Sequence, residues 1–548
     1  MISLRRLLVV SCALALTVSC SDDDEAGGGG SPSSEAVDAT APTNTDTSAP
    51  TTTRPAMTTT GPAAATTTAA ETPVTAAPTD QLTVETSSGA VHGADSAVAG
   101  VRQFLAIPYA APPVGERRWR PPEPAPSWTE PLDATAPGAS CPQSSEGVTA
   151  AVTVMPAWNE DCLTLSVWTP HDAVDLPVMV WFHGGGLTEG SAHQPLYIGD
   201  HLADRGVVVV NVNYRLGALG FLATDGLAAE GGGAFGNYGL ADQVAALHWV
   251  ADNVQRFGGD ADNVTIFGES AGGFSVCAHL ASAASAGLFD RAIVQSGGGC
   301  DQFQPAAEAV TAGTAFLEAN GCADLACLRA APAEQLLATS FSPALVADGT
   351  ILTTTALDQA TAGTVMPPVL IGSNADEATL FTIGAPEPTE QDLLDAAAMT
   401  GGDPAAVLEL YPPEQFPSGL ARLQALITDT AFACPTLAFA AASPASFVYH
   451  YTYVSASDPF GLGATHGAEL VLLFGHPEGI RGLEGEPDSA TVAVSEGIRQ
   501  AWVAFATTGD PGWANFGPGG EIRLLDDPLT STTEIRDGRC AGLAGLTP

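Results

Sequence analysis

The sequence Gly-Glu-Ser-Ala-Gly at residues 268–272 constrains the fold of this chain more than any other segment. It follows an apolar run at residues 263–267 and precedes a stretch of helical character. In that setting, a Gly-x-Ser-x-Gly sequence predicts a sharp turn from a strand into a helix, with the serine hydroxyl displayed at the turn. The two glycines allow close packing without a Cβ clash, and the N–H of Ala271 is free to face an oxyanion. We therefore expect Ser270 to be a nucleophile.

A second glycine-rich segment lies upstream. The apolar residues 177–182 predict a buried strand that runs directly into His183 and the three glycines at 184–186. Backbone N–H groups in such a loop are free to face a substrate carbonyl, as in the oxyanion hole of lipases and esterases. A flexible glycine loop without this role is the alternative interpretation. The order of the two segments along the chain favours the oxyanion hole.

The remaining hydrophobic pattern indicates the fold class. The chain is 45% hydrophobic, which is ample for a core, and short apolar runs alternate with helical segments. This alternation is typical of an α/β fold with a mostly parallel sheet.

Six further segments carry a resemblance to a known family. They are residues 107–115, 159–168, 211–221, 236–243, 253–260 and 502–511. Together with the serine segment, they resemble the type-B carboxylesterases, the cholinesterase and para-nitrobenzyl-esterase-like branch of the α/β-hydrolases. The resemblance covers nearly all of residues 82–548. It implies an α/β-hydrolase fold, with a large, mostly parallel central sheet flanked by helices, and one catalytic domain at residues 81–548.

The catalytic acid is expected after the serine, because this fold uses the order serine, acid, histidine. Residues 368–374 predict a strand, and Asp376 and Glu377 follow it. An acid just past a strand end lies at the edge of the sheet where the nucleophile is displayed. The resemblance selects Glu377, with Asp376 as the competing candidate. Asp348 is better interpreted as a turn residue.

The catalytic base is expected among His450, His466 and His476, the histidines that follow the acid. His466 stands in a loop of small residues that enters a predicted helix, and this segment resembles the histidine loop of the family. His450 lies in an alternating pattern at residues 447–453, which predicts a structural position in a strand. We therefore expect His466 to be the base.

The resemblance implies hydrolysis of carboxylic esters through an acyl-serine intermediate. His466, oriented by Glu377, takes the proton of Ser270 as the hydroxyl attacks the ester carbonyl. The alcohol then leaves with that proton, and water repeats the sequence on the acyl-serine. Neither a metal nor an organic cofactor is implied.

The groups around the triad are also assigned by the resemblance. The N–H groups of Gly185, Gly186 and Ala271 correspond to the oxyanion hole. Glu269, beside the nucleophile, and Ser296 resemble positions of the family that support the catalytic side chains from outside. For these last two residues, a purely structural position is an equally open interpretation.

Cysteine usage agrees with an oxidising compartment. Eight cysteines remain apart from Cys12 and Cys20. The resemblance implies the pairs Cys141–Cys162 and Cys322–Cys327, with Cys434–Cys540 as a third. Cys277 and Cys300 stay open between buried free thiols and a fourth pair. Disulfides persist in exported proteins and are rare in the cytosol.

The N-terminus predicts export. A basic start with Arg5 and Arg6 precedes an apolar segment at residues 7–18 that is too short for a stable membrane span. The segment ends in Thr-Val-Ser-Cys, which resembles a bacterial lipobox with Cys20 as the lipidated residue. Residues 1–20 are therefore expected to be a signal peptide, and an ordinary secretory signal is the alternative. No later apolar run approaches the ~20 residues that a span needs.

A tether is predicted between the signal peptide and the catalytic domain. Residues 21–80 are rich in Thr, Ala, Pro and Gly and contain no aromatic residue. Such a composition cannot bury a core and predicts disorder. This arrangement suits a cell-envelope lipoprotein on the outer face of the membrane, with a secreted protein as the alternative.

The charge of the chain limits the classes of partner that it can bind. All 18 basic residues are Arg, and 61 acidic residues give a net charge of −43. Such a surface repels nucleic acid and anionic lipid headgroups. Contact with a membrane is therefore expected only through the N-terminal lipid anchor. The acidic, Lys-free composition fits either adaptation to salt or a GC-rich genome, and the sequence does not indicate an oligomeric state.

The expected partner is a small-molecule ester. In cholinesterases, the loop between the first two cysteines carries an aromatic residue that stacks on a quaternary ammonium group. Here that loop is shorter, and Trp158 lies only four residues before Cys162, out of register with that position. A general carboxylesterase for short or medium acyl chains, or for aryl esters, is therefore favoured over a choline esterase.

Two other classes of function remain open on the same scaffold. One is a non-catalytic binding or adhesion protein of the neuroligin-like kind, which would be expected to lack the serine. The other is a lipase, a polyester hydrolase or a carbamate-cleaving enzyme.

Overall fold

The computed structural model describes residues 82–145, 147–231, 235–456, 458–483, 485–517 and 519–546. The predicted signal peptide with Cys20 and the predicted tether at residues 21–80 lie outside the described residues.

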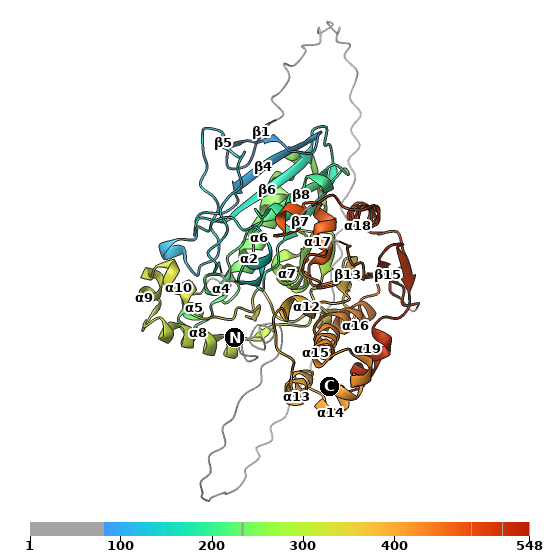
Figure 1. Ribbon diagram of the computed structural model, residues 1–548. Coiled ribbons are helices and arrows are strands. Elements are labelled where there is room, and N and C mark those ends of the chain that lie inside the picture. The colour runs from blue at the N-terminus through green and yellow to red at the C-terminus, as the bar shows by residue number, and fades with distance from the viewer. Residues whose placement is uncertain are drawn as a thin grey trace, which may run out of the picture. The chain divides into compact units, whose positions relative to one another are not determined.

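An 11-stranded sheet runs through the predicted catalytic domain (Figure 1). In spatial order its strands are β16 (Thr530–Thr532), β15 (Ile522–Leu525), β14 (Ser446–Tyr451), β13 (Val369–Asn374), β10 (Arg291–Gln295), β9 (Gly259–Glu269), β7 (Leu176–Phe182), β8 (Val208–Val212), β6 (Thr164–Pro170), β4 (Val101–Pro108) and β3 (Ala94–Asp95). The strands from β15 to β8 pair in parallel, and the strands at both edges pair antiparallel. The centre of the sheet is thus parallel, as the sequence predicts.

Two small sheets complete the strands of the described chain. One consists of β1 (Thr83–Glu85), β2 (Ala90–His92) and β5 (Leu132–Asp133), and the other of β11 (Gln304–Pro305) and β12 (Val346–Ala347).

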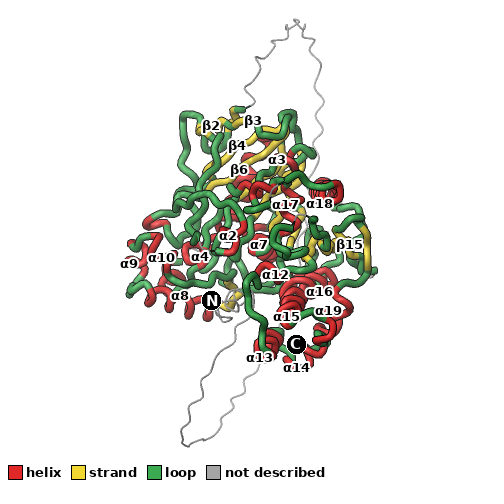
Figure 2. The backbone as a smooth tube through the Cα atoms, in the orientation of Figure 1, coloured by secondary structure: helices red, strands yellow, loops and turns green. Residues whose placement is uncertain are grey.

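Helices surround the sheet (Figure 2). They are α2 (Val148–Val152), α3 (Asp200–Ala203), α4 (Gly217–Phe221), α5 (Asp225–Glu230), α6 (Tyr238–Asn253), α7 (Ala271–Ala281), α8 (Ala306–Ala319), α9 (Leu325–Ala330), α10 (Ala333–Ala338), α11 (Ala356–Thr361), α12 (Ala378–Phe381), α13 (Glu390–Ala398), α14 (Pro404–Glu409), α15 (Gly419–Thr428), α16 (Cys434–Ala442), α17 (Ala468–Phe474), α18 (Ser489–Thr508) and α19 (Arg539–Ala544).

The central strands are buried on both faces. In β7, Val178, Val180 and Phe182 belong to one hydrophobic cluster, whereas Met179 and Trp181 belong to a second one. Side chains of α6 and α7 join the first cluster, and those of α17 and α18 join the second. Successive residues of a strand point to opposite faces, so a strand covered on both faces needs a continuous apolar run. This explains why the central strands are readable from the sequence.

One helical stretch differs from the sequence prediction. Residues Gly419–Ala442, which include α15, the π-helical segment η6 (Asp429–Ala433) and α16, are long and apolar enough to cross a membrane. It is the one such helix in the described part of the chain. The prediction that no later segment approaches this length is therefore wrong. Asp429 in this stretch is fully buried and forms ion pairs with Arg536 and Arg539, which is the packing of a core helix.

Four disulfides connect the described chain. Three of them join the pairs expected from the resemblance, Cys141–Cys162, Cys322–Cys327 and Cys434–Cys540. The fourth joins Cys277 in α7 to Cys300 in the loop after β10. The open question about these two cysteines is thus answered by a bond rather than by two free thiols.

Candidate active site

Ser270 stands at the turn between β9 and α7, with a φ of 56°. A positive φ is strained for a residue with a Cβ and persists only where the surroundings fix it. The glycines on either side supply that constraint. A Cβ at Gly272 would clash with the carbonyl oxygen of Phe182, and a Cβ at Gly268 would lie 2.5 Å from backbone atoms of Gly272. The turn is therefore packed too tightly for any residue but glycine at both positions.

The glycine loop after β7 lies directly against this turn. A Cβ on Gly184 would be 2.6 Å from Oε2 of Glu269 and 3.1 Å from Cβ of Ser270. Gly185 and Gly186 have φ angles of 105° and 61°, in the region that favours glycine. Within the described residues, the N–H groups of both glycines and of Ala271 donate no hydrogen bond to the protein. These three donors are available to an oxyanion beside Ser270.

Glu189 connects the glycine loop to α2 by hydrogen bonds. Its buried carboxylate accepts hydrogen bonds from the N–H groups of Thr149 and Ala150, at 3.0 and 3.2 Å. Its own backbone N–H donates to the carbonyl oxygen of Gly185 at 3.0 Å. The loop is thus tied to the N-terminus of α2.

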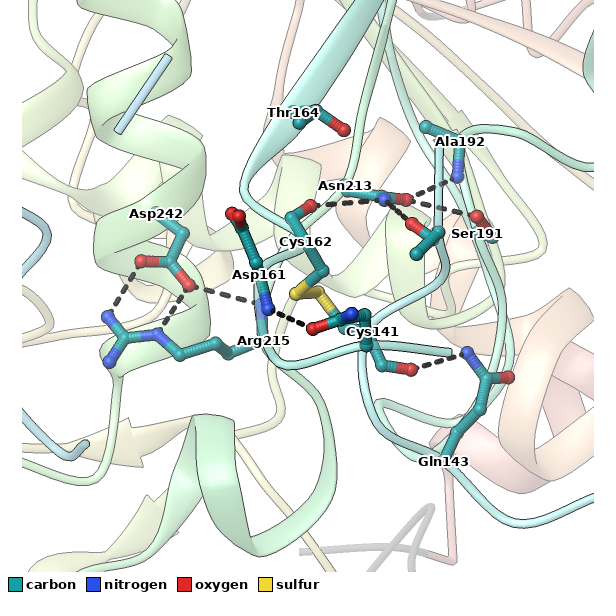
Figure 3. Close-up of a disulfide and its surroundings, with 12 residues drawn as sticks. Cys141, Gln143, Asp161, Cys162, Thr164, Ser191, Ala192, Asn213, Arg215 and Asp242 are labelled. Carbon is teal, nitrogen blue, oxygen red and sulfur yellow. Dashed lines mark hydrogen bonds and ion pairs between the residues drawn. A yellow bond between two sulfur atoms is a disulfide. The ribbon is translucent and has the colours of Figure 1, made fainter. Parts of the chain in front are cut away.

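The Cys141–Cys162 disulfide lies next to residues 190–192, which follow the glycine loop in the chain (Figure 3). Gln143 exchanges two hydrogen bonds with the backbone of Gly190, at 2.8 and 2.9 Å. The Asn213 side chain donates to the carbonyl oxygen of Cys162 and accepts from the N–H of Ala192. Hydrogen bonds of Gln143 and Asn213 thus link the region of the disulfide to residues 190–192.

His466 and Glu377 come together from distant parts of the chain. Nδ1 of His466, in the loop before α17, lies 2.6 Å from Oε2 of Glu377, just past β13. The other oxygen of Glu377 accepts 2.7 Å hydrogen bonds from the Ser296 hydroxyl and from the N–H of Asn374. Glu377 is fully buried. Its carboxylate is therefore fixed by two donors while it orients the imidazole.

The competing acids have other positions. A carboxylate oxygen of Asp376 accepts the N–H of Ala464 at 3.0 Å, so Asp376 supports the histidine loop. Oδ1 of Asp348 accepts three consecutive N–H groups at residues 350–352, as a turn residue does. The structure thus joins Glu377, and neither aspartate, to His466.

The competing histidines lie apart from this pair. His450 is buried in β14, where Nδ1 meets the carbonyl oxygen of Ser373 at 3.1 Å. Burial lowers its pKa to about 3, which suits a neutral structural imidazole. His476 contacts Asp200 and Glu478 instead of a triad residue.

Glu269 places a second carboxylate beside His466. Its Oε1 lies 3.0 Å from Nε2 of His466, as an ion pair. Burial raises the pKa of Glu269 to about 8, although the charge of His466 opposes this shift. Burial disfavours the His466 cation, yet Glu269 and Glu377 together raise the pKa of His466 to about 9. In the described structure, Nε2 of His466 has no aligned hydrogen-bond partner, Ser270 included.

The sequence interpretation missed Glu469. This residue lies in α17, three positions after His466, and is fully buried. It accepts hydrogen bonds from the side chains of Gln295 and Asn374, at 3.0 and 2.6 Å. Burial raises its pKa. A single acid within the apolar helix Ala-Glu-Leu-Val-Leu-Leu-Phe was the available signal.

Two aromatic rings beside His466 were also missed. The centroids of Phe381 and Phe432 lie 4.9 and 5.2 Å from that of the imidazole. Phe432 belongs to the π-helical segment η6, a type of irregularity that is frequent at functional sites. An irregular helix of this kind leaves no pattern in the sequence.

Comparison with known proteins decides the family. The model of the carboxylesterase family matches residues 80–517. The chain belongs to the carboxylesterase family. It is 38% identical over 443 residues to a para-nitrobenzyl esterase of Bacillus subtilis (strain 168), covering 75% of this chain and 87% of that protein. It is 36% identical over 494 residues to a fumonisin B1 esterase of Sphingopyxis macrogoltabida, covering 80% and 86%.

A solved structure agrees with this assignment. A para-nitrobenzyl (PNB) esterase superposes with a TM-score of 0.76 at 34% identity, over 84% of this chain and 99% of that one. The α/β-hydrolase fold predicted from the sequence is therefore confirmed. So is the prediction of a carboxylic ester hydrolase. The carboxylesterase thus acts on small-molecule esters.

Proposed function

We propose that this carboxylesterase hydrolyses its esters through an acyl-serine intermediate on Ser270, with His466 as the base and Glu377 as the acid of the triad. The observation that carries the proposal is the position of Ser270 at a strained turn, against a glycine loop with free N–H groups. The 2.6 Å contact between His466 and Glu377 supports it, because it holds the imidazole by Nδ1 and leaves Nε2 for the serine proton.

The first step is a proton transfer coupled to attack. Neutral His466 accepts the hydroxyl proton of Ser270 at Nε2 while the serine oxygen bonds to the ester carbonyl carbon. The negative charge that develops on the carbonyl oxygen is met by the N–H groups of Gly185, Gly186 and Ala271. Loss of one such donor costs about 2.7–4 kcal/mol of transition-state stabilisation.

The second step releases the alcohol and then the acid. His466 gives its proton to the leaving alkoxide, and the acyl group stays on Ser270. Water then attacks the acyl carbon and loses a proton to His466 in turn. His466 returns this proton to the Ser270 oxygen as the bond between that oxygen and the acyl carbon breaks, and the free carboxylic acid is released.

The proposed substrates are esters with a short or medium acyl chain and a good alcohol or phenol leaving group. The relatives named for para-nitrobenzyl esters support this choice. Export as an envelope lipoprotein, through residues 1–20 and Cys20, is a further part of the proposal. It is supported by the N-terminal sequence and by the four disulfides.

The test is release of p-nitrophenol from acetate, butyrate and octanoate esters by the wild-type chain and by Ser270→Ala. The proposal expects turnover that Ser270→Ala abolishes and that is greatest for acetate or butyrate. Activity that needs an emulsified long-chain ester would indicate a lipase. A folded protein without turnover on any ester or carbamate would indicate a binding protein.

A further inference from the structure

A cluster of metal-ligating side chains lies outside the triad. Asp200 and His201 are the first two residues of α3, and His476 follows the end of α17. One ligand atom from each of these three residues lies within 4.8 Å of the others. The proposed ester hydrolysis uses none of them.

Hydrogen bonds to residues outside the cluster already fix Asp200 and His476, its two most buried members. Asp200 and His476 are 1% and 7% exposed. Oδ2 of Asp200 accepts the hydroxyl of Ser96 at 2.6 Å, while Oδ1 lies 2.8 Å from Nε2 of His476. On the other side of the ring, Nδ1 of His476 lies 2.8 Å from a carboxylate oxygen of Glu478. In metal sites of proteins, a ligating imidazole usually bonds through its second nitrogen to a carboxylate, and a ligating carboxylate accepts a further hydrogen bond. Glu478 and Ser96 take these two positions here.

The donor set has a definite chemistry. Two imidazoles and one carboxylate are the ligands of three-residue zinc sites, in which a fourth position stays open to water. Hard cations such as Mg²⁺ and Ca²⁺ prefer oxygen ligands alone. The ring of His201 lies 5.0 Å from that of His476, centroid to centroid, and His201 is only half-buried. His201 is therefore the most exposed of the three candidate ligands.

The surrounding charges favour a dication. Arg499 is the main opposing group, because its guanidinium and His201 both lie against Gly475. Its neighbour Arg205 is paired with Glu496. The charged groups around the cluster are the carboxylates of Asp200, Asp204, Glu478 and Glu496 and the guanidinium groups of Arg205 and Arg499. Four negative groups against two positive ones leave two negative charges when both imidazoles are neutral.

We propose that Asp200, His201 and His476 bind one divalent transition-metal ion, with Zn²⁺ as the best match. Asp200 and His476 move apart slightly on binding, and His201 turns inward to complete the set. The ion would cross-link α3 to the segment after α17. Because α17 begins two residues after His466, the cross-link would stabilise the part of the chain that carries the base.

The test measures binding of Zn²⁺ alone to the full chain. Protein without a polyhistidine tag is stripped with a chelator and titrated with ZnCl₂ in equilibrium dialysis. The proposal expects one equivalent, weakened at least about tenfold in His201→Asn and His476→Asn. The control is His248→Asn, which removes an exposed histidine of α6 and leaves binding unchanged. His201→Asn keeps the test valid if the more buried His476→Asn does not fold.

Thermal unfolding gives a second measurement. An ion that binds only the folded state raises Tm. Excess Zn²⁺ is therefore expected to raise the Tm of the wild-type chain and of His248→Asn, and not that of His201→Asn. Absence of binding, or binding of the same strength in His201→Asn and the wild type, would overturn the proposal. The second result would mean adventitious binding at other groups, the His466 site among them.

Discussion

Oε1 of Glu269 lies 3.0 Å from Nε2 of His466, on the side of the ring opposite to Glu377. The nitrogen that is proposed to accept the serine proton therefore faces a buried carboxylate. Two carboxylates stabilise the imidazolium, which is the inactive form of a general base. Glu269 and His466 consequently titrate as a coupled pair, and the pH profile reports the pair rather than one residue.

The first prediction concerns pH. Only neutral His466 can accept the proton, so kcat/KM is expected to rise with pH towards the raised pKa of His466, about 9. Glu269→Gln removes a negative charge that raises this pKa, and the rising limb should move to lower pH by about 1 unit or more. The measurement is kcat/KM for p-nitrophenyl butyrate from pH 5 to 10, corrected for spontaneous hydrolysis. Glu318→Gln, an exposed change, is the control, and an unshifted limb in Glu269→Gln would contradict the account.

The second prediction separates the two candidate acids. Glu377→Gln should lower kcat by about 10⁴, because an amide cannot stabilise the imidazolium in the way that a carboxylate does. Asp376→Asn should keep most of the activity, since an amide oxygen still accepts the N–H of Ala464. Steady-state kinetics on both purified variants give the answer. Greater loss in Asp376→Asn, with both proteins folded, would reverse the assignment of the acid.

The third prediction concerns the turn at Ser270. Gly272→Ala places a methyl group against the carbonyl oxygen of Phe182, and such overpacking costs about 1–3 kcal/mol or more. Gly519→Ala is the matched control, because a Cβ there meets nothing within 4 Å. Urea unfolding should show a lower free energy of unfolding for the first variant alone. Equal stability of both variants would mean that the turn is not packed as described.

Much of this site can be predicted from the sequence, because several of its residues lie close together on short segments of the chain. The turn at Ser270 and the glycines before it lie on short segments whose spacing carries the chemistry. Glu377 and His466 needed the family resemblance, since no spacing joins residues 89 positions apart. Glu269 illustrates the limit. Its place beside the serine was evident, but its distance from His466 depends on how β9 and the loop before α17 pack.

The fourth prediction compares two disulfides. In the chain-entropy model, a bond stabilises more when it closes a longer loop. Cys434–Cys540 spans 106 residues and Cys322–Cys327 spans 5, which gives about 4.7 and about 2 kcal/mol. Replacing both cysteines of each pair by Ala should therefore lower the free energy of unfolding more for Cys434–Cys540. Urea unfolding measures the difference, and the reverse order would show that local packing outweighs loop length.

The central claim is that Ser270 forms the covalent intermediate. A p-nitrophenyl phosphonate reacts with an activated serine: the serine oxygen bonds to phosphorus, p-nitrophenolate leaves, and the phosphonyl-serine resists hydrolysis. This reagent is expected to label Ser270 in the wild-type chain. Peptide mass spectrometry then locates the label, with Ser270→Ala as the parallel sample. The account predicts one label on Ser270, accompanied by complete loss of turnover, and no label in the variant. A label on any other residue, or turnover that persists in Ser270→Ala, would contradict it.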